Sequence, residues 1–332
     1  MIDPQMHLVP DILSKEIKQE ATRMGFGRGL VEAAQVNKQI VALCADLTES
    51  TRIIEFAKAF PDRYVEIGIG EQNLVTVAAG MALAGKIPFT ASYAAFSPGR
   101  NWEQIRTTIC LNDTNVKIVG AHAGVSVGPD GATHQMLEDI AIMRVLPNMT
   151  VVVPADGVEA EKATQVLANH KGPAYIRLAR EKSPVITTDK TPFSLSKAQV
   201  LRRGKDLTIV ACGTMVYQAL VAAEKLAKKD IQVEVINAAV VKPLDTITIV
   251  ASARKTGAVL TVEEAQIAGG LGGAVAETLA DHEPVPMTRI GMLDHFGESG
   301  SPDELLEKFG LTSANIASQA TELIKRKQKP ST

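Results

Sequence analysis

Residues 64–84 read YVEIGIGEQNLVTVAAGMALA, and this stretch predicts a strand, a turn and a helix in direct succession. Tyr64–Ile67 is a short β-rich run, after which two glycines turn the chain. Glu71–Ala84 follows as a helix, and its small residues permit close packing. Glu71 is thereby expected where a strand ends, which is the edge at which open α/β sheets bind ligands.

The same alternation of strands and helices continues on both sides of this stretch. The polar segment Glu181–Ser196 carries two prolines and predicts a linker, and a second alternating unit follows it. We therefore predict an α/β protein with two doubly wound domains: residues 1–184 with a mainly parallel sheet, a linker at 185–200, and a smaller domain at 201–332. The expected helices of the first unit include Lys15–Asn37, Arg52–Ala59, Trp102–Leu111 and Thr133–Leu146.

The composition of the 332 residues excludes several classes of protein. With 45% hydrophobic residues and a formal net charge of −2, the chain has no strong field for nucleic acid or an anionic membrane. The polar start of the chain lacks an apolar signal core, and no stretch approaches the ~20 apolar residues of a membrane span. Three widely spaced cysteines favour a reduced, cytoplasmic protein.

A glycine-rich stretch at residues 120–135, GAHAGVSVGPDGATHQ, contains His122, Asp130 and His134. A loop of this length inside a compact domain is uncommon and tends to be functional. The structural alternative is a surface histidine at 122 and a helix cap at Thr133. Two histidines and an acid in one loop make that alternative less attractive.

Each of the other candidate residues also has a structural explanation. Glu71 can be a first-turn acid that complements the helix dipole. Tyr93 and Phe96 follow a strand, and aromatic residues at this spacing usually belong to the core. Residues 267–273, IAGGLGG, lack the spacing of a dinucleotide fingerprint, so tight strand-to-helix packing explains them better.

Three arginines are candidate contacts for an anion, because guanidinium groups suit phosphate oxygens. They are Arg23, Arg177 and Arg180, and a lone arginine is more often a solvated surface residue.

These pieces occur in an order that resembles the transketolase family from about residue 21 to residue 327. The closest likeness is to chains that carry only the C-terminal half of a transketolase. The run at 133–156 is also similar to 1-deoxyxylulose-phosphate synthases. The most specific stretches are Ala21–Arg23, Ala45–Leu47, Gly68–Asn73, Asp130–Gln135 and Phe296–Pro302.

The resemblance implies a pyrimidine-binding domain for thiamine diphosphate, followed by a transketolase C-terminal domain. Glu71 matches the family glutamate that hydrogen-bonds the aminopyrimidine ring and takes part in catalysis. Tyr93 and Phe96 match the aromatic wall around that ring. Asp46 matches an acid near the cofactor at a subunit interface. Gly99 stands where many relatives have a further aromatic residue, which bears on the shape of this pocket.

The resemblance also implies a site for sugar phosphates. Asp130 and His134 match residues that contact substrate hydroxyls near the reacting carbons, and His134 is expected to be catalytic. Ala132 replaces the proline of many relatives in the same loop, and Arg177 has no clear counterpart. The positions that match residues binding the sugar-phosphate substrate are Arg23, Ser50, His122 and Arg180.

A Gly-Asp-Gly motif, with which thiamine enzymes usually hold the metal and the diphosphate, does not occur in this sequence. No metal ligand is therefore expected in this chain. The resemblance implies that Mg²⁺ (or Ca²⁺) is held mainly by a partner, an N-terminal transketolase subunit. With the two halves on separate chains, an α2β2 heterotetramer is the natural closed assembly.

The resemblance thus implies the C-terminal subunit of a split transketolase, which is expected to be inactive alone. The expected reaction moves a two-carbon ketol group from a ketose phosphate to an aldose phosphate, as in the pentose phosphate pathway. Two enzymatic alternatives are a subunit like 1-deoxyxylulose-phosphate synthase and the β chain of a 2-oxo-acid dehydrogenase. The non-enzyme alternative is a scaffolding homologue. Glu71 and the two loop histidines argue against the scaffold, and the loop favours sugar phosphates.

Overall fold

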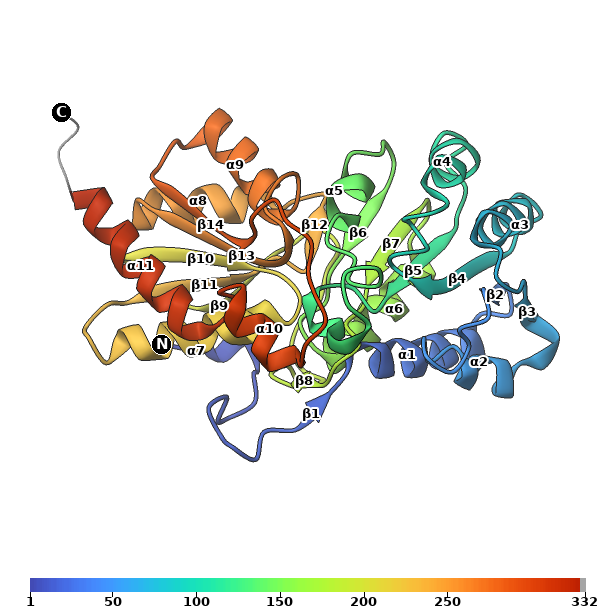
Figure 1. The fold of residues 1–332 in the computed structure, drawn as a ribbon, viewed down its shortest axis with the longest axis horizontal. Coiled ribbons are helices and arrows are strands. Elements are labelled where there is room, and N and C mark those ends of the chain that lie inside the picture. Colours follow the sequence, from blue (N-terminus) through green and yellow to red (C-terminus); the bar gives the residue numbers. More distant parts are fainter. Residues whose placement is uncertain (329–332) are drawn as a thin grey trace.

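The computed structural model describes residues 1–328, which form two α/β units that lie next to each other (Figure 1). Each unit has one main sheet with helices on both faces, so the predicted α/β fold class with mainly parallel sheets is confirmed. Residues 329–332, the end of the predicted second domain, lie outside the described residues.

The first unit is built on a seven-stranded sheet. Its strands run parallel, apart from the edge strand β12, which pairs antiparallel with β6. The spatial order is β12 (Val240–Lys242), β6 (Thr150–Val152), β7 (Ala174–Arg177), β5 (Lys117–Ala121), β4 (Ile87–Tyr93), β2 (Ile40–Cys44) and β3 (Tyr64–Glu66).

Both faces of this sheet are buried, because central strands such as β2 and β5 expose none of their residues. Successive side chains of a strand point to opposite faces, so each face needs its own cover. One face packs against α1 (Thr22–Val36), α2 (Ile54–Ala59) and α6 (Gly157–Asn169). The other packs against α3 (Glu71–Leu83), α5 (Asp139–Arg144) and a π-helical segment (Ile105–Cys110) that continues α4 (Trp102–Gln104).

The second unit has a five-stranded sheet whose edge strand β9 is antiparallel. Its strands in spatial order are β14 (Met287–Met292), β13 (Val259–Gln266), β10 (Leu207–Ala211), β11 (Val233–Asn237) and β9 (Gln199–Arg202). The helices on one face are α8 (Thr246–Thr256) and α9 (Leu271–His282). Those packed on the other side are α7 (Met215–Ala227), α10 (Pro302–Lys308) and α11 (Ser313–Gln328).

The chain crosses between the units more than once. Strand β12 follows the second unit's β11 in sequence but joins the first sheet. The N-terminal residues lie on the second unit, where the Asp3 amide donates to the Leu201 carbonyl at 2.9 Å. One apolar cluster contains buried residues of both sheets. The division at residues 184 and 200 therefore stays a prediction, and the two units share a core.

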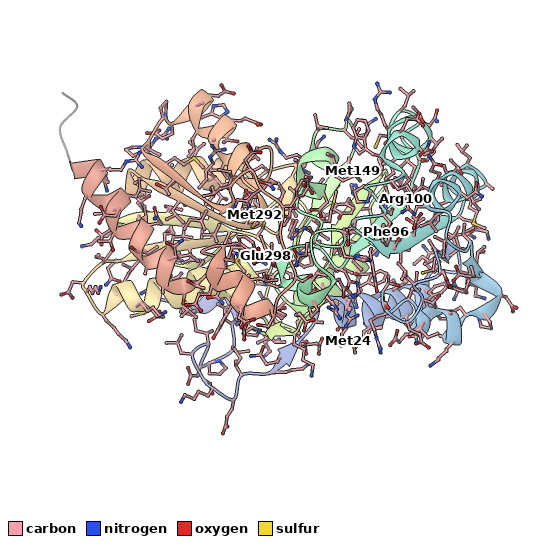
Figure 2. The ribbon with its side chains drawn as sticks, viewed as in Figure 1. Met24, Phe96, Arg100, Met149, Met292 and Glu298 are labelled. Atoms are coloured by element: carbon pink, nitrogen blue, oxygen red, sulfur yellow. The ribbon has the colours of Figure 1, made fainter. Side chains whose placement is uncertain are left out.

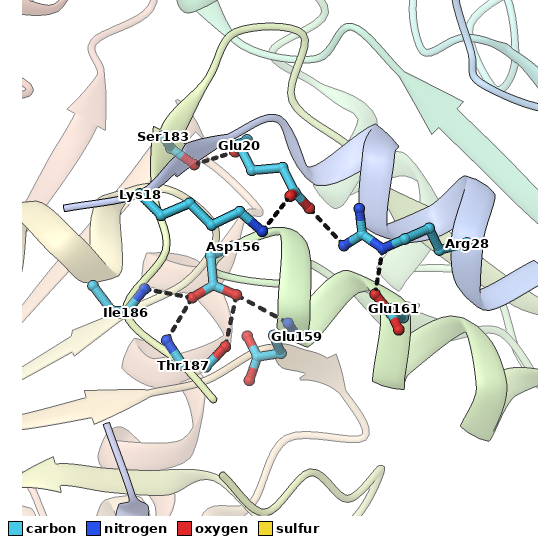
Figure 3. A network of polar contacts seen from close by, with 9 residues as sticks. All are labelled: Lys18, Glu20, Arg28, Asp156, Glu159, Glu161, Ser183, Ile186 and Thr187. Carbon is cyan, nitrogen blue, oxygen red and sulfur yellow. Dashed lines mark hydrogen bonds and ion pairs between the residues drawn. The ribbon is translucent and has the colours of Figure 1, made fainter. Parts of the chain in front are cut away.

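The expected linker is anchored by a buried carboxylate (Figure 3). Asp156, the N-cap of α6, accepts hydrogen bonds from the amides of Ile186 (2.8 Å) and Thr187 (2.7 Å). Nearby, Arg28 bridges Glu20 and Glu161 at 2.6 and 2.7 Å. The segment after the first unit is thus tied to that unit by polar contacts.

Two expected helices are shorter in the structure. The first begins at Thr22 instead of Lys15, because β1 (Gln19–Glu20) pairs antiparallel with β8 (Ser183–Pro184), which takes these backbone groups away from a helix. The helix expected from Thr133 begins at Asp139. Before it, the Met136 carbonyl accepts the Gly124 amide at 2.9 Å, so the preceding residues belong to a loop.

Within residues 1–328, no helix is both long and apolar enough to cross a membrane.

Candidate active site

The parallel strands β2, β4, β5 and β7 end at one edge of the first sheet, and the candidate residues follow these ends. Tyr93 is the last residue of β4, and His122 comes directly after β5. His122 has a left-handed backbone (φ 55°), which is uncommon for a residue other than glycine and favours a functional constraint. The sheet thus brings residues distant in sequence to one place.

An aromatic cluster lies at this edge, made of two aromatic and two histidine rings. The Tyr93 ring centroid is 4.0 Å from that of His122 and 6.0 Å from that of Phe96, which it stacks on. His134 meets Phe96 edge-on at 5.4 Å and Tyr93 at 6.2 Å. All four rings are predicted site residues, and Tyr93, Phe96 and His134 keep part of their surface open instead of joining the core.

A cationic group adjoins this cluster. Arg23, near the start of α1, donates from Nη1 to the Ser50 carbonyl at 2.7 Å and lies 3.3 Å from His122 Nε2. Arg180 donates from Nη1 to the Val127 carbonyl at 2.5 Å. Burial lowers the pKa of Arg23, and the charge of Arg180 lowers it further. Two guanidinium groups that disfavour each other in this way would both be stabilised by an anion between them.

The protonation state of His122 follows from these neighbours. The side chain is 2% exposed, and burial followed by the charges of Arg23 and Arg180 lowers its pKa to about 3. The imidazole is therefore neutral at physiological pH. Because a guanidinium only donates, Nε2 must accept from Arg23 and Nδ1 must carry the proton. Nδ1 is buried and has no partner among the described residues, so it is an unsatisfied donor.

A cavity of about 600 Å³ opens beside the two arginines and is lined from both units. Its charged lining has three cations and three carboxylates, and the start of α10 closes it at Ser301 and Pro302. The charged residues are Arg23, Arg180, Lys182, Glu20, Glu181 and Asp303. Asp130 lies at its side, with Oδ1 3.8 Å from Arg180 Nη1. The structure thus brings Arg23, Ser50, His122, Asp130 and Arg180 close together.

Glu71 begins α3 and is only 2% exposed, so it is more than a solvated first-turn acid. Its Oε2 accepts from Arg100 Nη1 at 2.7 Å, and its backbone oxygen accepts from Asn101 Nδ2 at 2.8 Å. The Arg100 guanidinium also lies 5.0 Å from the centroid of the Phe96 ring (Figure 2). Arg100 thus links the buried Glu71 carboxylate to the Phe96 face. A buried carboxylate of this kind can hold a protonated or hydrogen-bonding ring nitrogen.

The structure does not join Asp46 to this cluster. Asp46 is exposed, and it has a left-handed backbone with φ 58°. Its amide donates to Glu66 Oε1 at 2.8 Å, and Glu66 also accepts from the Gly68 amide at 2.9 Å. Within residues 1–328, no hydrogen bond or ion pair is formed by the Asp46 carboxylate, which leaves it available to another molecule.

Two sequence-level interpretations change. Arg177 is not an anion contact, because it is buried and its Nε donates to Asp139 Oδ2 at 2.8 Å. At Gly99, an added Cβ would lie 2.1 Å from the Ala95 carbonyl oxygen, so the aromatic residue of many relatives does not fit this backbone. The interpretation of the glycine-rich 267–273 run as packing agrees with the structure: Glu263 accepts the Leu271 and Gly272 amides, each at 2.7 Å.

Three residues that contribute to the site were missed from the sequence. Arg100 carries no local signal, since a lone arginine is common on surfaces. The other two are Glu264, which accepts from the Ser126 amide 138 positions away, and Gln135, which donates to the Glu298 carbonyl 163 positions away. Nothing in the sequence near these residues indicates such partners.

The residues fit one part of thiamine diphosphate. Glu71, Tyr93 and Phe96 offer a buried carboxylate and an open aromatic face, as an aminopyrimidine ring requires. For the metal the outcome differs: within residues 1–328, no group of three or more His, Cys, Asp or Glu side chains could hold an ion.

Comparison with known proteins bears directly on this geometry. Two family profiles match the chain: the transketolase pyrimidine-binding domain at residues 18–185 and the transketolase C-terminal domain at residues 196–316. The chain is 45% identical over 298 residues to the 6-deoxy-6-sulfo-D-fructose transketolase subunit SqwH of Clostridium sp. (strain MSTE9). The matched residues are 90% of this chain and 92% of that protein.

Two further relatives show how the chain relates to whole enzymes. The human transketolase is 37% identical over 308 residues, which are 92% of this chain but 49% of that protein. Among solved structures, a split gene transketolase described as an inactive beta4 tetramer has a TM-score of 0.87 and 46% identity, covering 93% of this chain and 99% of that chain. This chain is thus similar in extent to split subunits and to half of a full-length enzyme.

Proposed function

The chain belongs to the transketolase family, as the counterpart of its C-terminal half, and we propose that it is one subunit of a two-chain transketolase. The proposed reaction moves a two-carbon ketol group from a ketose phosphate to an aldose phosphate. One observation carries the proposal: Arg23 lies next to His122 and close enough to Arg180 for the two charges to disfavour each other, and the His122 ring packs on Tyr93 of the aromatic cluster. These three groups form the proposed anion site.

The anion site binds the phosphate end of the sugar. Arg23 and Arg180 supply charge-assisted donors, which are the strong hydrogen bonds for phosphate oxygens. His122 adds a neutral Nδ1–H donor, fixed as that tautomer by Arg23 at Nε2, 3.3 Å away. A neutral donor adds no repulsion to the two nearby cations, so all three groups can face one anion.

The other end of the sugar meets Asp130 and His134. Thr133 Oγ1 is 2.9 Å from His134 Nδ1, which leaves Nε2 as the ring nitrogen that faces a substrate hydroxyl. His134 can hold or move a proton there, which is the usual task of a histidine in catalysis. Asp130 accepts from a second hydroxyl and fixes the orientation of the sugar chain.

Glu71, Tyr93 and Phe96 would hold the aminopyrimidine of thiamine diphosphate, and Asp46 lies free at the same sheet edge for contact across an interface. When bound, the cofactor supplies a carbon nucleophile and an electron sink. Glu71 holds a proton at the ring nitrogen, and Tyr93 and Phe96 exclude water from the ring. Arg100 shares the Glu71 carboxylate, so it takes part in setting that proton's position.

A partner chain completes the site. We propose that an N-terminal transketolase subunit holds Mg²⁺ (or Ca²⁺) and the diphosphate, in an α2β2 heterotetramer. The extent of the matched segment, about half of a full-length transketolase, supports this division.

The three cysteines are buried and free, which supports a reduced, cytoplasmic setting.

The decisive test measures ketol transfer from xylulose 5-phosphate to ribose 5-phosphate, with thiamine diphosphate and Mg²⁺. The chain is assayed alone and mixed with its candidate N-terminal partner. Activity in the mixture only is the expected result. Appreciable transfer by the pure chain alone would contradict the shared site.

The anionic group of the substrate need not be a phosphate. The name of the Clostridium relative concerns a sulfonated sugar, and the same three donors suit the three oxygens of a sulfonate. Assays of the mixture with 6-deoxy-6-sulfofructose and with fructose 6-phosphate as donors distinguish the two. Pyruvate decarboxylation by the mixture would instead support a 1-deoxyxylulose-phosphate-synthase-like reaction, and full cofactor binding without turnover would support a scaffolding homologue.

A further inference from the structure

A carboxylate of the second unit accepts a backbone hydrogen bond from the loop that carries Asp130 and His134. The Ser126 amide donates to Glu264 Oε1 at 2.6 Å, and Glu264 belongs to β13 and is 4% exposed. The carboxylate enters a niche next to Gly124, where φ is 95° and an added Cβ would lie 2.3 Å from Oε1. Only glycine permits this approach, because it has no Cβ and tolerates positive φ.

A second contact comes from Gln135 at the other end of the loop. Its Nε2 donates to the carbonyls of Val125 (3.2 Å), Gly128 (3.0 Å) and Glu298 (2.8 Å). The first two acceptors belong to the loop itself, and Glu298 belongs to the segment before α10, which lies between the two units in Figure 2. Gln135 is 3% exposed, so this amide is a buried link between three backbone segments.

The segment of Glu298 fits closely onto the loop along its length. An added Cβ at Gly131 would lie 2.6 Å from Ser299 Oγ, and one at Gly128 would lie 3.2 Å from the Pro302 ring. Both glycines have positive φ, at 73° and 80°. The backbone on either side of Asp130 is therefore in contact with the second unit.

We propose that Glu264 and Gln135 are positioning residues, through which the second unit sets the place of Asp130 and His134. They act on the backbone that leads into Asp130, at Val125, Ser126 and Gly128. The inference gives the second domain a part in the reaction, and its kinetic part rests on the proposed function. A displacement of about 1 Å in such groups is enough to cost about 10²-fold in rate.

The first experiment measures hydrogen exchange by mass spectrometry on the full chain and does not depend on activity. Glu264→Ala and Gln135→Met should raise exchange in peptides covering residues 124–135 by at least about tenfold, because the loop loses its anchors. Glu264→Gln can still accept from Ser126, so it should restore most of the protection. Unchanged protection in both destabilising variants overturns the proposal.

Two matched controls separate the loop from general stability. Thr214→Val removes the 3.3 Å bond to the other oxygen of the same carboxylate and leaves Ser126 alone. Gln218→Met removes a glutamine bond of 3.0 Å to the Ser313 amide, far along the second unit. Both should leave exchange at residues 124–135 unchanged. An equal rise in the controls means that any loss of stability opens the loop, which also overturns the proposal.

The second experiment uses the complex with the N-terminal partner and measures kcat and KM for the donor sugar. Loss of positioning should raise KM for the donor and lower kcat/KM by about 10–100-fold. A purely structural role would lower the concentration of active enzyme and leave KM unchanged, and that result overturns the proposal. If the wild-type complex transfers no ketol group, the proposed function fails, and the exchange experiment still decides whether Glu264 and Gln135 hold the loop.

Discussion

Two strand-to-helix turns of this molecule both contain glycines and a nearby glutamate, but the two glutamates bind different partners. In the first unit, glycines lead from β3 into α3, and Glu71 stands at the first helical position. In the second unit, glycines lead from β13 into α9, and Glu263 of the strand is the nearby acid. Both carboxylates are buried, at 2% and 0% exposed.

The difference lies in what each carboxylate contacts. Glu263 uses both oxygens to accept the Leu271 and Gly272 amides, so the helix start that could bind an anion is filled by the chain itself. Glu71 makes no such bond to its helix; it accepts instead from Arg100, whose guanidinium lies over the Phe96 ring. A glycine-rich turn is therefore a candidate site only where the fold leaves its acid unbonded to the amides of the helix start.

The strongest test of this contrast is Glu71→Ala in the complex with the N-terminal partner. We expect kcat/KM for ketol transfer to fall by about 10²–10⁴-fold, the range for loss of a group that handles a proton. Asn101 binds the backbone oxygen of residue 71, so the helix start and the thermal unfolding curve should change little. Activity near the wild-type rate would mean that Glu71 has no such role.

The reverse result is expected at the second turn. Glu263→Ala leaves two buried amides without acceptors, which should lower the free energy of unfolding by about 2–4 kcal/mol. Urea denaturation measures this, and kcat per folded molecule should stay unchanged. Glu277→Ala is the control on the same helix, because the Glu277 carboxylate is largely exposed and its ion pair with Arg144 should contribute less than about 1 kcal/mol. Equal losses in both variants would contradict the capping role of Glu263.

The two regions should also respond to pH with opposite signs. Burial lowers the pKa of His122 to about 3, below its value of about 6.5 in an unfolded chain. The unfolded state then binds more protons, so His122 lowers stability as pH falls below about 6.5, by up to about 1.4 kcal/mol per pH unit. Burial raises the pKa of Glu263 to about 7, so its contribution is present at low pH and is lost as pH rises through about 7.

Substitution with glutamine removes each titration. Unfolding free energies measured from pH 4 to pH 8 should fall less steeply toward acid in His122→Gln than in the wild type. In Glu263→Gln they should fall less steeply toward alkali. A His122→Gln curve parallel to the wild type would show that His122 is not held neutral.

The smallest effect is expected for Arg100→Gln. Arg100 is half exposed, so its ion pair with Glu71 is partly screened, and we expect a loss of about 1 kcal/mol in unfolding free energy. Arg106→Gln, at an exposed position on the following segment, serves as the control and should cost nothing measurable. If Arg100→Gln lowers the free energy of unfolding as much as Glu263→Ala does, the Arg100–Glu71 pair is mainly structural, like the bonds of Glu263 to the α9 amides.

The sequence predicted where the candidate site residues lie better than it predicted their burial, protonation and bonding partners. The alternation of strands and helices placed Glu71, Tyr93 and His122 at strand ends, and parallel strands bring such ends to one edge. The predicted start of the helix at Thr133 was wrong, because α5 begins at Asp139. The residues before it form a loop, in which the Met136 carbonyl accepts the Gly124 amide. Arg177 was weighed as an anion contact, although it is buried against Asp139.

By itself, the sequence determined the α/β class, the two units and the motifs that place the chain in its family, because these depend on local periodicity and short patterns. Only the tertiary structure decided that Glu71 faces Arg100, that His122 is neutral, and that Glu264 supports the loop at Ser126. These properties depend on burial and on partners up to 138 positions away, and no local pattern of residues encodes either.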